Sequence, residues 1–307
     1  MTLLVFAPPT ARWLKHLERL PGDLRIVTGA TAEAFPADAI AEAKVLVTTG
    51  SHGPLIQELW AGFRNLEWIH SLAAGLESVL FPELVQSPVV VTNARGVFAR
   101  SLGEFALAGM LWFAKDLNRM RRQQEMKEWK PFDVEELHGR TLGVVGHGSI
   151  GRAASELALA FGMKVRGIGR KADRAEFEDV LRAADYLVVA APLTSETRGM
   201  LGAAEIEMLK PACVIINLGR GPVIDEAALI DALQCRRIRG AVLDVFDTEP
   251  LPADHPFWTM DQVLLSPHTA DHTATWMDEC MDLFVNNFDN WRSGATLDNI
   301  VDKEIGY

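Results

Sequence analysis

The chain has 307 residues, of which 49% are hydrophobic, and a formal net charge of −11. A chain of this length and composition can bury the cores of two ordinary domains without disulfide staples. The negative charge argues against nucleic acid as a partner, because it repels phosphate backbones.

The first part of the chain alternates short apolar runs with stretches of helical spacing. Strands are predicted at residues 2–7, 24–28, 44–49, 66–71 and 89–93, and helical spacing lies between them, as at residues 12–20. This alternation is typical of parallel strands joined by crossover helices. A long helix is predicted over residues 101–128, and a loop over residues 129–138 follows it.

A second series of strands begins after this loop. Its members are predicted at residues 141–145, 164–168, 186–190, 213–218, 241–245 and 263–266. Six strands suit a complete dinucleotide-binding sheet, so the helical spacing of residues 273–292 is expected to return to the first domain. The fold class is therefore α/β with two doubly wound domains. Residues 99–271 form a Rossmann dinucleotide-binding domain, and residues 1–98 with 272–307 form a discontinuous, flavodoxin-like substrate domain.

A glycine-rich turn follows the first strand of the second series. Gly146-His-Gly148-Ser-Ile-Gly151 lies between an apolar strand and a helical pattern, which is the context that the dinucleotide fingerprint requires. Gly146 allows a tight turn, Gly148 lets the backbone approach a pyrophosphate, and Gly151 lets helix and strand pack closely. The helix N-terminus presents unpaired N–H groups to the anion. The predicted cofactor-binding residues of this turn are Gly146, His147, Gly148, Ser149, Ile150 and Gly151. The side chain of His147 is interpreted as incidental, and a turn without a ligand is the alternative.

The strand after this turn ends in basic residues. Arg170 stands where an acidic residue would accept the ribose 2′-hydroxyl of NAD, with Lys171 adjacent and Arg174 nearby. Such a position suits the 2′-phosphate of NADP(H). NADP(H) is therefore the expected cofactor, with NAD(H) possible, and a surface arginine at a strand end is the alternative for Arg170.

Three later segments place polar residues directly after predicted strands, the edge at which doubly wound sheets bind ligands. They are Asn217-Leu-Gly-Arg220-Gly, Asp244-Val-Phe-Asp-Thr-Glu249-Pro-Leu and Ser266-Pro-His268. Together with the glycine turn, this ordered set resembles the D-isomer-specific 2-hydroxyacid dehydrogenase family along nearly the whole chain. The basic cofactor position, residues 121–124 and the region of Trp129 resemble the glyoxylate/hydroxypyruvate reductase branch most.

The resemblance implies a role for each of these residues. Arg220 would bind the carboxylate and carbonyl of a 2-ketoacid, His268 would be the acid/base, and Glu249 would orient His268. A guanidinium fits a planar carboxylate, and a histidine titrates near neutral pH. Asp244 matches a position near the nicotinamide carboxamide, although a buried structural aspartate is the alternative. The implied activity is reduction of a small 2-ketoacid to the D-2-hydroxyacid with NAD(P)H.

Ser71-Leu-Ala-Ala-Gly75 in the first domain resembles the family loop whose backbone amides hold the substrate carboxylate. Ala73, Ala74 and Gly75 are small enough to expose such amides, and a plain strand-to-helix turn is the alternative. The ketoacid is then expected in a cleft between the domains. Asp271-His272 departs from the family, which more usually has a glycine there. The other histidines match no catalytic motif and are expected at the surface or in loops: His16, His52, His70, His138, His255 and His272.

Other functions remain open at this point. D-3-phosphoglycerate or another D-2-hydroxyacid dehydrogenase using NAD would carry the same motifs, and so would a non-catalytic, dinucleotide-sensing corepressor. The family resemblance implies a homodimer, with residues 101–128 as the expected contact. Three dispersed cysteines, without metal-ligand spacing, fit a reducing compartment and no metal. A short apolar N-terminus and no apolar run of about 18 residues predict a cytoplasmic protein without a membrane segment.

Overall fold

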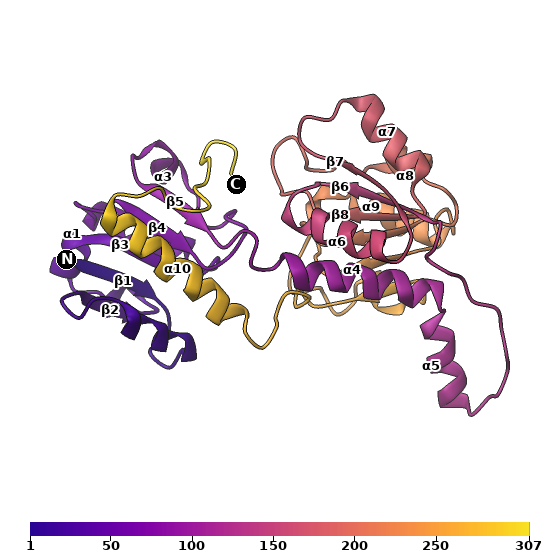
Figure 1. Cartoon of the computed structure of the whole chain (residues 1–307), viewed down its shortest axis with the longest axis horizontal. Coiled ribbons are helices and arrows are strands. Elements are labelled where there is room, and N and C mark those ends of the chain that lie inside the picture. The colour runs from indigo at the N-terminus through magenta and orange to yellow at the C-terminus, as the bar shows by residue number, and fades with distance from the viewer. Residues whose placement is uncertain (307) are drawn as a thin grey trace. The chain divides into compact units, whose positions relative to one another are not determined.

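A computed structural model describes residues 1–306 and divides them into two compact units (Figure 1). Unit 1 consists of Met1–Phe98 and the segment from Ala274 onward, and unit 2 is Ala99–Thr273. The chain therefore leaves unit 2 after Thr273, where the sequence-based boundary stood after residue 271.

Unit 1 is built on a parallel five-stranded sheet in the order β2-β1-β3-β4-β5. This is the doubly wound, flavodoxin-like order, as predicted. Its strands are β1 Thr2–Phe6, β2 Arg25–Gly29, β3 Ala43–Thr48, β4 Trp68–Ser71 and β5 Val90–Asn93. Its helices are η1 Arg12–Arg19, η2 Ala32–Ala34, α1 Ala37–Glu42, α2 Gly53–Leu59, η3 Trp60–Gly62, α3 Pro82–Gln86 and α10 Trp276–Ser293.

Alternating side chains of this sheet fill two separate layers. Leu4 and Phe6 of β1 belong to one cluster with Ile40 of α1 and Ile56 of α2. On β4, Trp68 instead stacks on Phe284 of α10, with ring centroids 5.6 Å apart. The last helix thus covers a sheet formed by the first part of the chain, because its apolar stripe completes that layer.

Unit 2 is built on a parallel six-stranded sheet in the order β11-β10-β9-β8-β6-β7. The strand order reverses between β6 and β8, and this topological switch point is where such sheets bind nucleotides. The strands are β6 Thr141–Val145, β7 Lys164–Ile168, β8 Tyr186–Val189, β9 Val214–Asn217, β10 Gly240–Leu243 and β11 Val263–Leu265. The helices are α4 Ala99–Ala114, α5 Leu117–Met126, α6 Ser149–Ala160, α7 Arg174–Ala183, α8 Ala203–Met208, η4 Gly221–Val223, α9 Glu226–Gln234 and η5 Pro256–Thr259.

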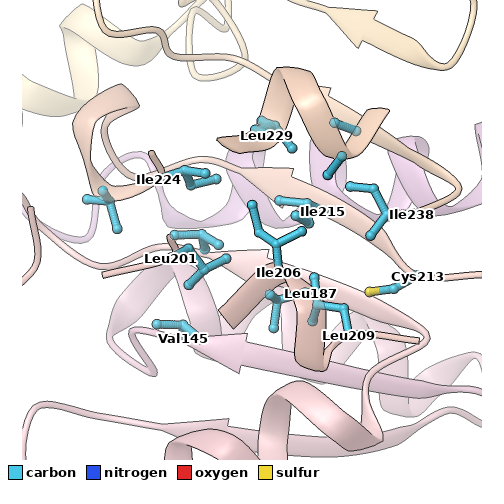
Figure 2. Packing of buried hydrophobic residues seen from close by; sticks show 14 of the residues in the cluster. Val145, Leu187, Leu201, Ile206, Leu209, Cys213, Ile215, Ile224, Leu229 and Ile238 are labelled. Atoms are coloured by element: carbon cyan, nitrogen blue, oxygen red, sulfur yellow. The ribbon is translucent and has the colours of Figure 1, made fainter. Parts of the chain in front are cut away.

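One face of the unit 2 sheet carries a large apolar core (Figure 2). Leu187 and Ile215 of neighbouring strands pack there with Ile206 of α8 and Leu229 of α9, and all four side chains are buried. Each such side chain contributes about 1.5–3 kcal/mol of transfer free energy. The opposite face is covered by α4 and α6, where Gly109 of α4 lies directly on Val242. This packing holds the carboxyl ends of the strands in fixed positions.

The prediction of one helix over residues 101–128 is wrong. The chain forms α4 and α5 instead, because Asp116 has a left-handed φ of 47° that ends the first helix. The Asp116 carboxylate then caps α5 by accepting a hydrogen bond from the amide of Arg119. The helical spacing of residues 12–20 likewise corresponds to a 3-10 helix, η1. Within residues 1–306, no helix combines the length and apolarity needed to cross a membrane.

Candidate active site

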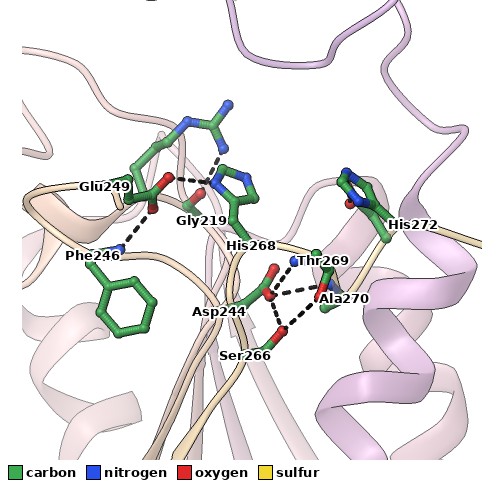
Figure 3. A network of polar contacts seen from close by, with 11 residues as sticks. Gly219, Asp244, Phe246, Glu249, Ser266, His268, Thr269, Ala270 and His272 are labelled. Carbon is green, nitrogen blue, oxygen red and sulfur yellow. Dashed lines mark hydrogen bonds and ion pairs between the residues drawn. The ribbon is translucent and has the colours of Figure 1, made fainter. Parts of the chain in front are cut away.

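A histidine–carboxylate pair lies at the carboxyl edge of the unit 2 sheet (Figure 3). His268, just after β11, has its Nδ1 2.7 Å from Oε2 of Glu249, in the loop after β10. The other carboxylate oxygen of Glu249 accepts a hydrogen bond from the amide of Phe246 at 2.9 Å. Since Nδ1 faces the carboxylate, Nε2 on the far side of the ring is the nitrogen that can exchange a proton with a ligand.

The pair shifts the protonation of both partners. The hydrogen bond to Glu249 raises the pKa of His268 above its ordinary value, outweighing the opposing effects of burial and of Arg220. Burial tends to raise the pKa of Glu249, but the hydrogen bonds from His268 and the Phe246 amide bring it below its ordinary value. The arrangement therefore stabilises an imidazolium beside a carboxylate.

Asp244 holds the loop that carries the histidine. This side chain is only 2% exposed. Its Oδ1 accepts hydrogen bonds from Ser266 Oγ at 2.5 Å and from the amides of Thr269 and Ala270 at 3.0 and 3.1 Å. His268 lies between these anchors with a left-handed φ of 55°, which costs free energy for a residue with a Cβ. Three hydrogen bonds to one buried oxygen maintain this conformation, so Asp244 has a structural role.

Arg220 lies in the loop after β9, at the same edge of the sheet. Asn217 braces this loop, since its Nδ2 donates to the Arg220 carbonyl at 3.1 Å and its Oδ1 accepts from the Gly219 amide at 3.2 Å. A Cβ at Gly221 would lie 2.0 Å from the backbone of Phe246, so the Arg220 loop packs directly on the loop that leads to Glu249. The Arg220 guanidinium also contributes to the pKa values of both His268 and Glu249. The three predicted catalytic side chains thus lie close together.

The glycine turn connects β6 to α6. Gly146 has a φ of 91°, and a Cβ there would lie 2.5 Å from the amide of Ala191. A Cβ at Gly151 would lie 2.4 Å from the Gly146 carbonyl, so both glycines are required by the backbone itself. A Cβ at Gly148 would meet nothing within 4 Å. The backbone of Gly148 therefore faces open space, where a ligand can approach.

Comparisons with known proteins identify the family of this chain. The model of the D-isomer specific 2-hydroxyacid dehydrogenase, NAD binding domain, matches residues 107–270. A glyoxylate reductase of Thermococcus gammatolerans is 31% identical over 81% of this chain and 80% of its own length. The chain belongs to the D-isomer-specific 2-hydroxyacid dehydrogenase family. It is an NAD(P)-dependent oxidoreductase that acts on CH–OH groups.

Two further relatives show the range of the family. A D-3-phosphoglycerate dehydrogenase of Methanocaldococcus jannaschii is 30% identical over 97% of this chain and 59% of its own length. The solved structure of a D-isomer specific 2-hydroxyacid dehydrogenase from Xanthobacter autotrophicus, in complex with NADPH and MES, is 28% identical. Its TM-score is 0.86, and the match covers 100% of this chain and 99% of that one.

The glycine turn of this dehydrogenase fits a dinucleotide. Helix α6 begins at Ser149, its N-cap is Gly148, and no side chain caps its first amides. Its first turn carries no acidic residue that would repel an anion. The open backbone at Gly148 and these amides match the requirements of a pyrophosphate. A bound nicotinamide dinucleotide would supply the hydride for the family's reaction.

The basic turn after β7 is partly occupied by ion pairs. Arg170 is half exposed, and its Nε lies 3.6 Å from a carboxylate oxygen of Glu196. Arg174, the nearby basic residue noted in the sequence, pairs with Glu178 and Glu205 at 2.8 Å each. Those two carboxylates neutralise Arg174, whereas Lys171 is exposed and Arg170 has a single, longer contact to Glu196.

The small-residue loop of unit 1 follows β4. The amide of Ala73 donates to Ser71 Oγ at 3.3 Å, and Asn93 Nδ2 donates to the Ala74 carbonyl at 2.7 Å. Among residues 1–306, none accepts a hydrogen bond from the amides of Ala74 and Gly75. The amides of Ala74 and Gly75 are therefore the ones in this loop that remain without an acceptor among residues 1–306.

Sequence reasoning missed the residues that position this site. The roles of Asn217, Ser266 and the Phe246 amide depend on contacts between loops that follow different strands. Asn217 and Ser266 stand inside the recognised motifs, so their polarity was the available signal. The side chain of His147, interpreted as incidental to the cofactor, has its Nε2 3.0 Å from Ser155 Oγ, a contact that the sequence did not predict.

Proposed function

We propose that this dehydrogenase reduces small 2-ketoacids of the glyoxylate and hydroxypyruvate class to D-2-hydroxyacids, with NADPH as its preferred cofactor. The observation that carries the proposal is the 2.7 Å hydrogen bond between His268 and Glu249, which favours a protonated histidine. A protonated acid is what reduction of a carbonyl needs. The similarity to a named glyoxylate reductase supports the substrate class.

The side chains of this chain divide the work of reduction. Arg220 binds the carboxylate and carbonyl oxygens of the ketoacid through its planar guanidinium, and the amides of Ala74 and Gly75 contribute to carboxylate binding. As C2 is reduced, the carbonyl oxygen takes the proton held at His268 Nε2 and becomes the hydroxyl. Glu249 stabilises the imidazolium before this transfer and keeps the ring oriented. Asp244 keeps the histidine loop in place, and its other oxygen is available to the nicotinamide carboxamide.

A panel of ketoacids tests the substrate class. Glyoxylate, hydroxypyruvate, pyruvate and 3-phosphohydroxypyruvate would each be incubated with the protein and with NADPH or NADH. Consumption of the cofactor would be followed by the absorbance of the reduced nicotinamide. The highest kcat/KM is expected for glyoxylate or hydroxypyruvate.

Two other outcomes of the panel have definite meanings. A higher kcat/KM with 3-phosphohydroxypyruvate would favour the phosphoglycerate alternative, which the Methanocaldococcus jannaschii relative supports. No consumption above background with any ketoacid would indicate a dinucleotide-sensing role without catalysis.

The preference for NADPH rests on Arg170. A charge-assisted hydrogen bond contributes about 1.5–3 kcal/mol, or roughly tenfold to a hundredfold in affinity. Arg170→Asp is expected to reverse the preference, because its carboxylate repels a 2′-phosphate and accepts from a free ribose hydroxyl. The measurement is kcat/KM with both cofactors. Arg174→Gln is the matched control, since Arg174 is already paired with two carboxylates, and it should leave the ratio unchanged. Equal values for wild type would remove Arg170 from cofactor choice.

We also propose a homodimer that uses α5 and the loop after it. Figure 1 shows α5 extending beyond the end of α4, away from the unit 2 sheet. Met120 and Met126 of this helix are exposed, and Trp129 after it is 96% exposed. Apolar side chains gathered on one segment are typical of an interface. Light scattering coupled to gel filtration should give twice the chain mass, and Trp129→Glu should lower it toward that of a monomer.

A further inference from the structure

His147 connects three elements at the glycine turn. Its amide and that of Gly146 both donate to the Ile168 carbonyl, at 2.9 and 3.0 Å, which ties the turn to the end of β7. Its ring lies on β7, since a Cβ at Gly167 would be 2.6 Å from His147 Cδ2. Its Nε2 reaches α6 at Ser155. This side chain is thus held between the turn, the helix and the strand.

The hydrogen bonds of Ser155 fix the tautomer of His147. Ser155 is buried, and its hydroxyl lies 2.7 Å from the Gly151 carbonyl and 3.0 Å from His147 Nε2. A carbonyl can only accept, so the single hydroxyl hydrogen goes to Gly151. Ser155 Oγ must then accept from Nε2–H, and in the neutral ring Nδ1 carries the lone pair.

The geometry also decides which edge of the ring is available. Cγ, Cδ2 and Nε2 lie closest to Gly167, and Nε2 is used by Ser155. Nδ1 is on the opposite edge of the ring. Within residues 1–306 no hydrogen bond involves Nδ1, and His147 is only partly buried, so Nδ1 can accept a hydrogen bond from a ligand. After β7 the chain continues through Gly169 to Arg170, the position that faces the adenosine ribose in doubly wound sheets.

We propose that His147 is a further cofactor-binding residue, whose Nδ1 accepts a hydrogen bond from the 3′-hydroxyl of the adenosine ribose. The inference rests on the proposed function, in which Arg170 and Lys171 bind the 2′-phosphate. The 3′-hydroxyl is then the ribose group that still has a proton to donate. Since NADH and NADPH share that hydroxyl, His147 contributes to the affinity for both, and Arg170 discriminates between them.

Nucleotide fragments separate the two roles without catalysis. The probes are ADP, 2′,5′-ADP and 3′-deoxy-ADP, with dissociation constants measured by calorimetry on the full chain. His147→Phe keeps a ring on Gly167 but removes Nδ1. It should weaken ADP and 2′,5′-ADP by the same factor, about two- to tenfold for one neutral hydrogen bond, and leave 3′-deoxy-ADP unchanged. Arg170→Ala, the matched variant, should weaken 2′,5′-ADP alone.

Wild-type protein provides a test that does not depend on a variant folding. It should bind 3′-deoxy-ADP more weakly than ADP by the same factor that His147→Phe costs. Equal affinities of the wild type for these two probes would overturn the proposal, and so would an equal loss for all three probes in His147→Phe, which indicates packing alone. A loss for ADP and 3′-deoxy-ADP, but not for 2′,5′-ADP, would assign His147 to the 2′-hydroxyl instead. If the wild type bound neither NADPH nor any fragment, the dinucleotide site itself would be wrong.

Discussion

The polar cluster around His268 in unit 2 and the one around His70 in unit 1 place the same side chain in opposite environments. His268 is partly exposed and bonded to a carboxylate, which raises its pKa. The prediction that His70 lies at the surface or in a loop is wrong, because it is a fully buried residue of β4, and burial lowers its pKa to about 3. Its Nδ1 lies 2.7 Å from Thr92 Oγ1, and its Nε2 is buried without a hydrogen-bond partner.

The difference shows that neighbouring elements decide what a histidine does. Phe284 of α10 covers the ring of His70, with centroids 5.5 Å apart, and closes it off from water. The side chain of His268 is 42% exposed, in the loop that follows β11 beyond the strand ends (Figure 3). Burial favours the neutral ring, whereas a carboxylate favours the charged one. The first environment suits packing, and the second suits proton transfer.

The largest expected effect is on catalysis through His268. His268→Ala should lower kcat by roughly 10²–10⁴-fold, because the proton donor for the carbonyl oxygen is lost. The dissociation constant of NADPH should stay near that of the wild type. His70→Leu is the matched variant from unit 1, and it should retain kcat. The measurement is kcat of both variants with the best ketoacid of the panel. Similar losses of kcat in both variants would mean that the different environments of His268 and His70 do not determine their roles.

The next effect tests whether the Glu249 carboxylate raises the pKa of His268. Reduction needs the protonated imidazole, so its rate should fall as pH rises through the pKa of His268. Because Glu249 raises that pKa, Glu249→Gln should move this limb of the kcat/KM profile toward lower pH. Oxidation of the hydroxyacid should show the opposite limb. A limb that stays in place would mean that the hydrogen bond has no effect on the proton.

The smallest effect concerns stability and His70. The ordinary pKa of histidine is 6.5, and that of folded His70 is about 3. Between these values the unfolded chain binds a proton that the folded chain does not, so stability should decrease as pH falls below about 6.5. The expected slope is about 1.4 kcal/mol per pH unit. His70→Leu should reduce it, whereas replacing the exposed His138 with Gln should not. Urea unfolding at several pH values between neutral and acidic measures the slope.

Much of the fold follows from local patterns in the sequence. Apolar, β-branched runs predicted all eleven strands of the structure, with ends that differ by about one or two residues. The glycine turn could be recognised because the backbone at Gly146 and Gly151 excludes a Cβ, which restricts the residue type. The residues Arg220, Glu249 and His268 could be chosen because the motifs that carry them follow strands and resemble those of the family in the same order. Their catalytic roles stay predictions until the variants are measured.

The sequence by itself determined the α/β class, the family and the strand ends that carry polar groups, because these depend on residues close together in the chain. Only the tertiary structure decided which polar groups meet. The break at Asp116 depends on one backbone dihedral that helical spacing does not encode. Arg174 is neutralised by Glu205 of another helix, and His70 is buried by Phe284 of α10. Such contacts form between segments far apart in sequence, and local propensity carries no information about them.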